Sequence, residues 1–178
     1  MWTLMRPDAT SILKDVKCKR SLARYFDVFQ NKRNAKFLIA KKLEADFSKD
    51  DSLDQLWKTH EDRLDEYFDL EKEVDDKTAT SLDEIESPDI SFLDLKIAIA
   101  KQIIQRCELC ERLDKPNRLA GQLGFCKCEE HASVSTYFEH MGEEPELVPS
   151  GTIFTCGCTL RCLHCQNWTI SQWHETGK

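Results

Sequence analysis

Hydrophobic side chains recur at helical spacing through most of the first 107 residues. The clearest stripe follows Ser52, a good helix-capping residue, and lies on one face of a helix with 3.6 residues per turn. Its members are Leu53, Leu56, Trp57, His60, Leu64, Tyr67 and Phe68. Ser11 is expected to cap an earlier helix that runs through Leu13 to Phe29, and a second helix is expected from about Ala35 to Leu43. Together these two segments predict a helical hairpin.

An acidic run separates this helical region from the second half of the chain. Residues 71–90 are poor in large apolar side chains and end near Ser87-Pro88, so they predict a mobile linker. A helical pattern resumes from Leu93 to Cys107. The predicted organisation is a helical domain (1–70), the linker (71–90), a helix plus cysteine-rich metal-binding segment (91–131) and a further domain that begins at 132 and runs to 178.

Near the C-terminus the helical spacing of apolar residues gives way to a short run of β-formers. Gly151-Thr-Ile-Phe-Thr155 follows a Pro-Ser turn and is rich in β-formers, so it predicts a buried strand. A dense set of cysteines follows this strand directly, and the strand is expected to position these cysteines.

Charge and cysteine content limit the function classes. The net charge is −7, with a basic stretch over 1–43 and an acidic one over 44–94, which favours mutual neutralisation over a nucleic-acid surface. No apolar run approaches the roughly 18 residues of a membrane span, so a cytoplasmic protein without nucleic-acid or membrane partners is expected. Nine cysteines in such a compartment are kept reduced, and close spacings then indicate metal or cluster ligands. Cys18 stands apart from the others and is expected to be an ordinary helical cysteine.

Three cysteines after the predicted strand have the spacing of an iron–sulfur loop. Cys158, Cys162 and Cys165 form CxxxCxxC, which lets one loop present three thiolates to a four-iron cube. One iron then stays open, and the amino and carboxylate groups of S-adenosylmethionine (SAM) can chelate it. A zinc knuckle is the alternative, because CxxC pairs also occur in zinc sites. Cys156 is either a strand-end residue or a spare thiol.

A second group of cysteines lies upstream. Cys107 and Cys110 form a CxxC, and Cys126 and Cys128 form a CxC, with glycines between the pairs that permit tight turns. Four thiolates can hold a tetrahedral zinc ion or an auxiliary iron–sulfur cluster, and plain reduced thiols are the third interpretation. His131 is a reserve ligand.

The segments Arg118-Leu-Ala-Gly121 to Cys126, His140-Met-Gly142-Glu143-Glu144-Pro145 and Gly151 to Gln172 match one family. Over about residues 91–175 the chain resembles radical SAM proteins related to pyruvate formate-lyase activating enzyme. The resemblance implies a glycyl-radical-activase-like protein that uses a [4Fe–4S] cluster and SAM, takes electrons from a reductant such as ferredoxin or flavodoxin, and acts on a protein or other substrate. It also places His164 near the adenine of SAM, although an aromatic residue usually stands there, and makes Asn167 a second SAM-contact candidate. His140 and the two glutamates are interpreted as a charged loop rim rather than as part of the approach to the cluster.

The expected fold is a mainly α N-terminal region, a Cys-rich metal-binding segment, and the first strand and cluster loop of an incomplete α/β radical SAM partial barrel. Thirteen residues follow Cys165, too few for the later strands, so a partner chain that supplies the rest of the barrel is expected, together with an exposed apolar edge. Two function classes remain: the N-terminal portion of a radical SAM enzyme, and a non-catalytic helical zinc-binding module or remnant of a split gene.

Overall fold

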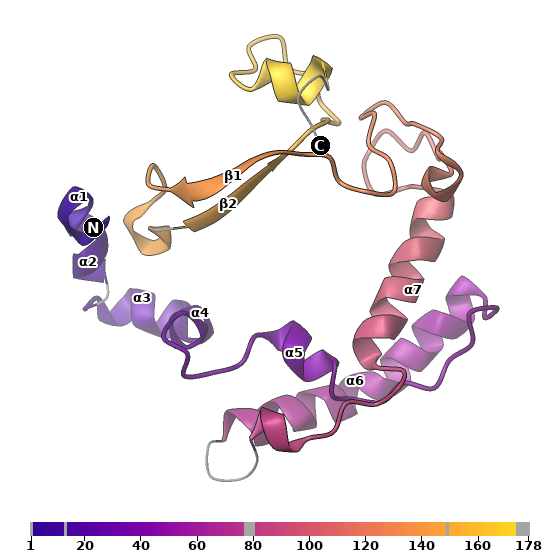
Figure 1. Cartoon of the computed structure of the whole chain (residues 1–178), viewed down its shortest axis with the longest axis horizontal. Helices are drawn as coiled ribbons and strands as arrows, with labels where there is room; N and C mark the ends of the chain where they lie inside the picture. Colours follow the sequence, from indigo (N-terminus) through magenta and orange to yellow (C-terminus); the bar gives the residue numbers. More distant parts are fainter. Residues whose placement is uncertain (1, 13, 77–80, 149, 174–178) are drawn as a thin grey trace. The chain divides into compact units, whose positions relative to one another are not determined.

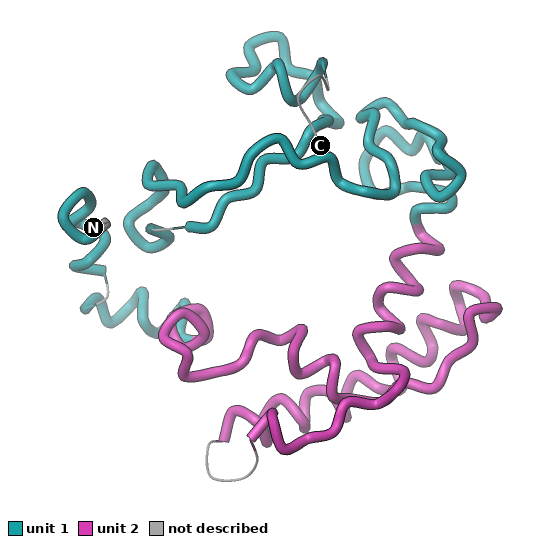
Figure 2. The backbone as a smooth tube through the Cα atoms, in the orientation of Figure 1, with its two compact units in different colours: residues 1–23, 104–178 teal, residues 24–103 magenta. Residues whose placement is uncertain are grey.

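The structure is a computed structural model that describes residues 2–12, 14–76, 81–148 and 150–173. The chain divides into two compact units (Figure 2). Unit 1 comprises residues 1–23 and 104–178, and unit 2 comprises residues 24–103. Every cysteine belongs to unit 1. None of the described helices is long and apolar enough to cross a membrane.

Unit 2 is built around two helices, α6 (Leu53–Asp75) and α7 (Phe92–Gln105) (Figure 1). The last two residues of α7 belong to unit 1. Ser52 caps α6 as predicted, in a reciprocal capping box with Gln55. Ser91 caps α7 in the same way, because its hydroxyl accepts the Asp94 N–H while its own N–H donates to the Asp94 carboxylate. The core of the unit lies between these helices and the short α5 (Lys36–Ala40), and its most deeply buried side chains are Phe92, Ile39, Leu56 and Leu95.

The prediction of one continuous helix from Ser11 to Phe29 is wrong. The structure has four short helices, α1 (Trp2–Met5), α2 (Pro7–Ile12), α3 (Val16–Ser21) and α4 (Ala23–Phe29). Ser11 lies inside α2, where its hydroxyl donates to the Asp8 carbonyl instead of capping. The Asp15 carboxylate accepts the Cys18 N–H and starts α3, so the chain begins a new helix there. Leu13 lies outside the described residues.

The boundaries of two further predicted segments also differ. The helix from Ala35 ends at Ala40, and residues 43–45 run extended, with Phe92 and Ala45 donating to the Leu43 and Ile90 carbonyls. Helix α6 continues to Asp75, so residues 71–75 are helical rather than linker. Farther along, Leu82 in the one-turn helix η1 (Leu82–Glu84) is buried in the core of unit 2. Residues 77–80 of the predicted linker lie outside the described residues.

Unit 1 contains a two-stranded antiparallel hairpin of β1 (Val134–His140) and β2 (Ser150–Thr155), drawn in orange tones in Figure 1. The strand predicted at Gly151–Thr155 is present, but the prediction that it is buried is wrong, because its residues alternate between half-buried and exposed. The two strands form the sheet of the described residues, and no barrel is present among them. Three short helical turns complete the unit: η2 (Arg118–Ala120), η3 (Pro145–Leu147) and η4 (Thr169–Trp173).

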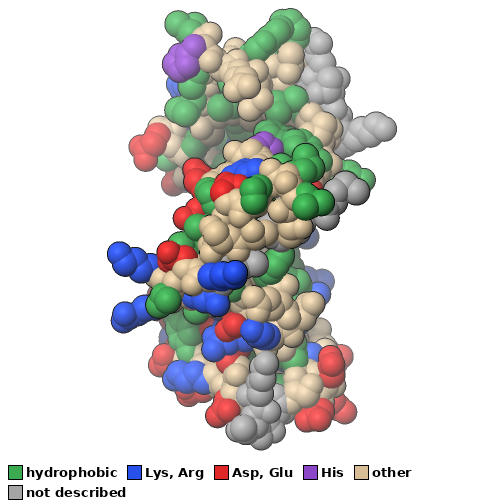
Figure 3. All heavy atoms as spheres, turned by 90° about the vertical axis from the view of Figure 1, so that its left-hand side faces the viewer, with side chains coloured by type: hydrophobic (Ala, Val, Ile, Leu, Met, Phe, Trp, Pro, Cys, Tyr) green, Lys and Arg blue, Asp and Glu red, His purple; other side chains and the backbone are tan. Residues whose placement is uncertain are grey.

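Large hydrophobic side chains stay exposed on the hairpin. Tyr137 is 80% exposed and Ile153, its cross-strand partner, is 66% exposed. Figure 3 shows hydrophobic side chains at the surface among charges of both signs on the face that it displays. The hairpin thus presents apolar area that nothing in the described chain covers.

Candidate metal centre

Unit 1 contains a cavity of about 360 Å³ whose wall includes six cysteines from three segments. They are Cys107, Cys110, Cys126, Cys128, Cys156 and Cys158. The four upstream cysteines that the spacing grouped are therefore gathered around one space. Cys158 also lines that space, whereas Cys162 and Cys165 do not.

Tight turns fold the upstream cysteines back on one another. The Cys107 N–H donates to the Pro116 carbonyl, closing the loop that carries Cys110. Gly121 has a φ of 73°, the left-handed conformation that favours glycine. Gly124 allows a close approach, because an added Cβ would stand 2.6 Å from an Asp114 carboxylate oxygen. The two glycines predicted to permit turns thus do so, and they return the chain to Cys126.

A buried arginine, Arg118, lies against this cysteine group. Its side chain is 7% exposed, and its guanidinium donates to the Cys126 sulfur at 3.3 Å and to the Cys128 carbonyl. Burial opposes ionisation of the Cys126 thiol, but the Cys128 backbone N–H and Arg118 prevail and hold its pKa below the ordinary value. Burial, and next the neighbouring Cys126, raise the pKa of Cys128 to about 11. One thiolate beside a cation is therefore favoured here.

The CxxxCxxC loop is held by backbone hydrogen bonds. Donation from the Arg161 and Leu160 backbone N–H groups lowers the pKa of Cys158, and the Leu160 nitrogen lies 3.4 Å from the Cys158 sulfur. Gly157 and Arg161 both have positive φ, 94° and 53°, which turns the chain sharply around Cys158. The loop therefore presents the Cys158 sulfur in a setting that stabilises its thiolate.

The end of the loop is fastened to η4. Gln172 donates to the Cys162 carbonyl at 3.1 Å, and the Cys165 sulfur lies 3.4 Å from the Ser171 hydroxyl. Asn167 accepts the Ser171 N–H through its carbonyl. The side chains of His164 and Asn167, the predicted SAM contacts, are both exposed.

An aromatic ring connects the two cysteine segments. The guanidinium groups of Arg112 and Arg161 lie 3.8 and 4.3 Å from the centre of the Phe125 ring. Arg161 also donates to the Phe125 carbonyl, and Arg112 donates to the Thr159 carbonyl at 3.0 Å. Three of these contacts, two from Arg161 to Phe125 and one from Arg112 to Thr159, thus tie the upstream segment to the loop after Cys158.

No three His, Cys, Asp or Glu side chains among the described residues converge closely enough to share a single metal ion. The reserve ligand His131 is exposed and does not line the cavity. Cys156, which the sequence left undecided, is 3% exposed in the cavity wall, and its carbonyl lies 3.6 Å from the Cys128 sulfur. The spacing of the motifs predicted neither the position of Cys156 in the cavity wall nor the position of Arg118 beside the cysteines.

The other candidate polar residues of unit 1 lie on the far end of the hairpin. His140 Nδ1 is 3.1 Å from a Glu143 carboxylate oxygen, and the Glu143 and Met141 carbonyls accept hydrogen bonds from Arg6. The Cys18 sulfur lies 3.8 Å from a carboxylate oxygen of Glu146 in the neighbouring turn η3. These residues hold the N-terminal helices to the hairpin and do not line the cysteine cavity.

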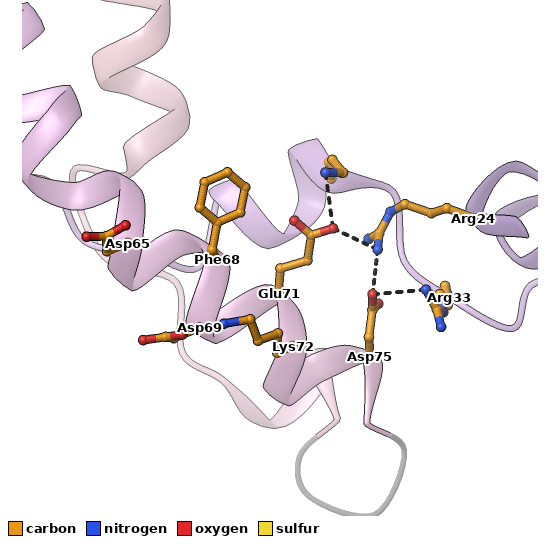
Figure 4. Close-up of a pocket in the computed structure, with 9 residues that line it drawn as sticks. Arg24, Arg33, Asp65, Phe68, Asp69, Glu71, Lys72 and Asp75 are labelled. Atoms are coloured by element: carbon orange, nitrogen blue, oxygen red, sulfur yellow. Dashed lines mark hydrogen bonds and ion pairs between the residues drawn. The ribbon is translucent and has the colours of Figure 1, made fainter. Parts of the chain in front are cut away.

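Unit 2 has a larger cavity of about 760 Å³ with charged walls (Figure 4). Arg24 pairs with Glu71 and Asp75, Arg33 pairs with Asp75, and Lys36 pairs with Glu71. The expected neutralisation of basic by acidic segments is confirmed for these residues. Because each of these side chains has a partner of opposite charge, the cluster is explained as a connection between α6 and the chain before it.

Comparison with known proteins gives one informative match. No family model matches the chain, and no solved structure matches it. Over 151 residues, 85% of its length, the chain is 42% identical to a protein of Methanocaldococcus jannaschii named uncharacterized protein MJ0674. The chain spans 42% of the length of that protein.

Proposed function

We propose that unit 1 binds a [4Fe–4S] cluster through Cys158, Cys162 and Cys165 and serves as the N-terminal portion of a radical SAM protein of the activating-enzyme type. The observation that carries the proposal is the CxxxCxxC loop itself, which leaves β2 directly and is fixed at both ends, by the Phe125 contacts and by η4. Three cysteines at this spacing supply one thiolate to each of three irons and leave the fourth iron open.

The donor set suits such a cluster chemically. A tetrahedral ion needs all its ligands around one point, whereas a cube takes one thiolate per iron, so its ligands surround a larger object. The absence of a convergent single-ion set among the described residues is therefore compatible with a cube. Hydrogen bonds from backbone N–H groups to the Cys158 sulfur stabilise the thiolate that a metal binds.

When bound, the cluster and SAM together supply reductive cleavage of the SAM carbon–sulfur bond and a 5′-deoxyadenosyl radical. The residues of this chain would bind the cluster and orient SAM. Cys158, Cys162 and Cys165 would hold the irons, and His164 and Asn167, whose side chains are exposed, would contact SAM. Arg161 positions the loop through its contacts with Phe125.

We also propose as partners a segment or separate chain that supplies the remaining barrel, a ferredoxin or flavodoxin as reductant, and a protein substrate. The chain spans 42% of the length of the similar M. jannaschii protein. The alternative is a non-catalytic zinc-binding module, whose ligands would be the four upstream cysteines.

Anaerobic reconstitution with iron and sulfide, followed by reduction and electron paramagnetic resonance, separates the two functions. The radical SAM proposal expects a cluster signal that changes on addition of SAM and is lost in the Cys158→Ala/Cys162→Ala/Cys165→Ala variant. Cys18→Ala is the matched control, because Cys18 lies in α3 beside Glu146 and outside the loop. A colourless chain that holds zinc alone would support the module.

A further inference from the structure

We infer that the upstream cysteines Cys107, Cys110, Cys126 and Cys128 bind a second iron–sulfur cluster, not a zinc ion, and that Arg118 is its hydrogen-bonding partner. Cys158 of the CxxxCxxC loop also lines this cavity, but the four proposed ligands lie outside the loop, so the inference stands whether or not the loop binds SAM. The four cysteines, each in the wall of one cavity, supply the number of thiolates that an iron–sulfur cluster takes.

The size of the space argues for a cluster. Zinc holds each sulfur at about 2.3 Å, which brings four sulfurs to within roughly 4 Å of one another. The described residues provide no such convergent set, although all four cysteines face one cavity. The cavity measures about 360 Å³, whereas a single bound water occupies only about 10–15 Å³. Thiolates arranged around a volume of this size match an object with several metal atoms.

A buried cation lies against the four cysteines. Arg118 is 7% exposed and donates to the Cys126 sulfur. An assembly of iron, sulfide and four thiolates carries net negative charge, which Arg118 offsets. Hydrogen bonds to cysteine sulfur are also one of the means by which a protein sets the reduction potential of such a cluster.

The apolar part of the wall completes the site. Ile104 at the end of α7, Leu109 and Ala132 line the same cavity. The contacts of Arg112 and Arg161 with Phe125 place this site next to the CxxxCxxC loop.

The test uses the full chain with Cys158, Cys162 and Cys165 replaced by alanine, so that the proposed SAM cluster cannot form. This variant is incubated anaerobically with ferrous iron, sulfide and an equal amount of Zn²⁺. We expect iron and sulfide to remain bound with visible charge-transfer absorption, and the signal to disappear when Cys107→Ala and Cys126→Ala are added. Binding of one zinc per chain without iron, or of no metal, would overturn the inference. Circular dichroism of each variant checks that the helices are retained.

A second measurement tests Arg118 as a positioning residue. Replacing Arg118 by Met removes the hydrogen bond to the Cys126 sulfur, and we expect the reduction potential of the retained cluster to become more negative. Arg118→Lys keeps the charge and is expected to restore part of the shift. The same reduction potential in the unsubstituted chain, Arg118→Met and Arg118→Lys would contradict the role given to Arg118. The potential is read from the cluster itself.

Discussion

At the scale of single residues, His60 shows how a histidine on an apolar stripe is used. The sequence places it on the apolar stripe after Ser52, and the structure places its ring against Phe92, with centroids 4.9 Å apart. Its Nε2 lies 2.7 Å from the Lys96 ammonium nitrogen. Since an ammonium only donates, the imidazole accepts this hydrogen bond and is neutral.

This arrangement predicts a pH dependence of stability. Burial, and next the Lys96 charge, lower the pKa of His60 from 6.5, against a smaller opposite effect of Glu61. Between the lowered pKa and 6.5 the unfolded chain binds more protons than the folded one, so stability falls as the pH falls through this window. Urea unfolding midpoints measured from pH 8 to pH 5 should decline, and His60→Gln should flatten the curve. An equally steep curve in His60→Gln would contradict the assignment.

The residues of the cysteine sites were predictable to different degrees. The ligand candidates were predicted from close cysteine spacings, and the structure brings the upstream pairs Cys107/Cys110 and Cys126/Cys128 to one cavity. Arg118 could not be found in this way, because its burial beside Cys126 depends on a loop that folds back only in three dimensions. Cys156 was undecided for the same reason.

At the scale of elements, the last turn of α6 connects this helix to the preceding chain. The Asp75 side chain is 14% exposed and accepts ion pairs from Arg24 and Arg33, while the Glu71 side chain is 13% exposed and pairs with Arg24 and Lys36. Figure 4 shows Glu71 and Asp75 of α6 facing Arg24 and Arg33 of the preceding chain. An acidic composition made this segment resemble a linker, because ion-pair partners that are distant in sequence leave no local pattern.

Removing one charge of this network is expected to be costly. Asp75→Asn leaves two arginines with a lost partner and should lower the free energy of unfolding by about 1–3 kcal/mol. Asp69→Asn is the matched control, because the Asp69–Lys72 pair lies on the same helix with both side chains more than three-quarters exposed, and a change of less than about 0.5 kcal/mol is expected. Chemical denaturation of the two variants measures the difference. Equal effects would show that the Asp75 network adds no stability.

Helix α7 offers a similar comparison for packing. Phe92 is fully buried at its first turn, so Phe92→Ala should cost about 3–5 kcal/mol through lost contacts and a residual cavity. Ile97 on the same helix is 46% exposed, and Ile97→Ala should change stability by no more than about 0.5 kcal/mol. Thermal unfolding followed by circular dichroism measures both. A small effect of Phe92→Ala would contradict the assigned core.

Elements with a strong local signal were predicted well. The stripe after Ser52 combines a cap with a regular apolar face, and the pattern from Leu93 does the same after Ser91, so both helices formed where expected. The N-terminal segment lacked this agreement, because Asp15 competes as a cap within the apolar pattern. The strand at Gly151–Thr155 was found from β-propensity, but its exposure depends on which neighbours cover it.

At the scale of the whole molecule, the hairpin presents apolar side chains on a surface that the described chain does not cover. Tyr137 and Ile153, a cross-strand pair, are exposed on one face of this hairpin. A two-stranded hairpin is rarely stable alone, and surfaces of this kind mark sites of association.

The exposed pair can be tested by substitution. The exposed pair predicts that the chain self-associates. Tyr137→Ser with Ile153→Thr should reduce this association, because apolar area is removed, with little change in the free energy of unfolding. Glu139→Gln, also exposed on β1, is the matched control and should leave association unchanged. Light scattering over a range of concentrations provides the measurement. Unaltered association in the double variant would show that another surface is responsible.

The central claim, that Cys158, Cys162 and Cys165 hold a SAM-binding cluster, is tested most directly by electron paramagnetic resonance of the reduced, reconstituted chain with and without SAM. The account predicts a cluster signal that SAM changes, that Cys18→Ala retains, and that also appears in a Cys107→Ala/Cys126→Ala variant lacking the second cluster. Replacement of the three loop cysteines should abolish the response to SAM. A signal that SAM leaves unchanged in every one of these proteins would contradict the claim.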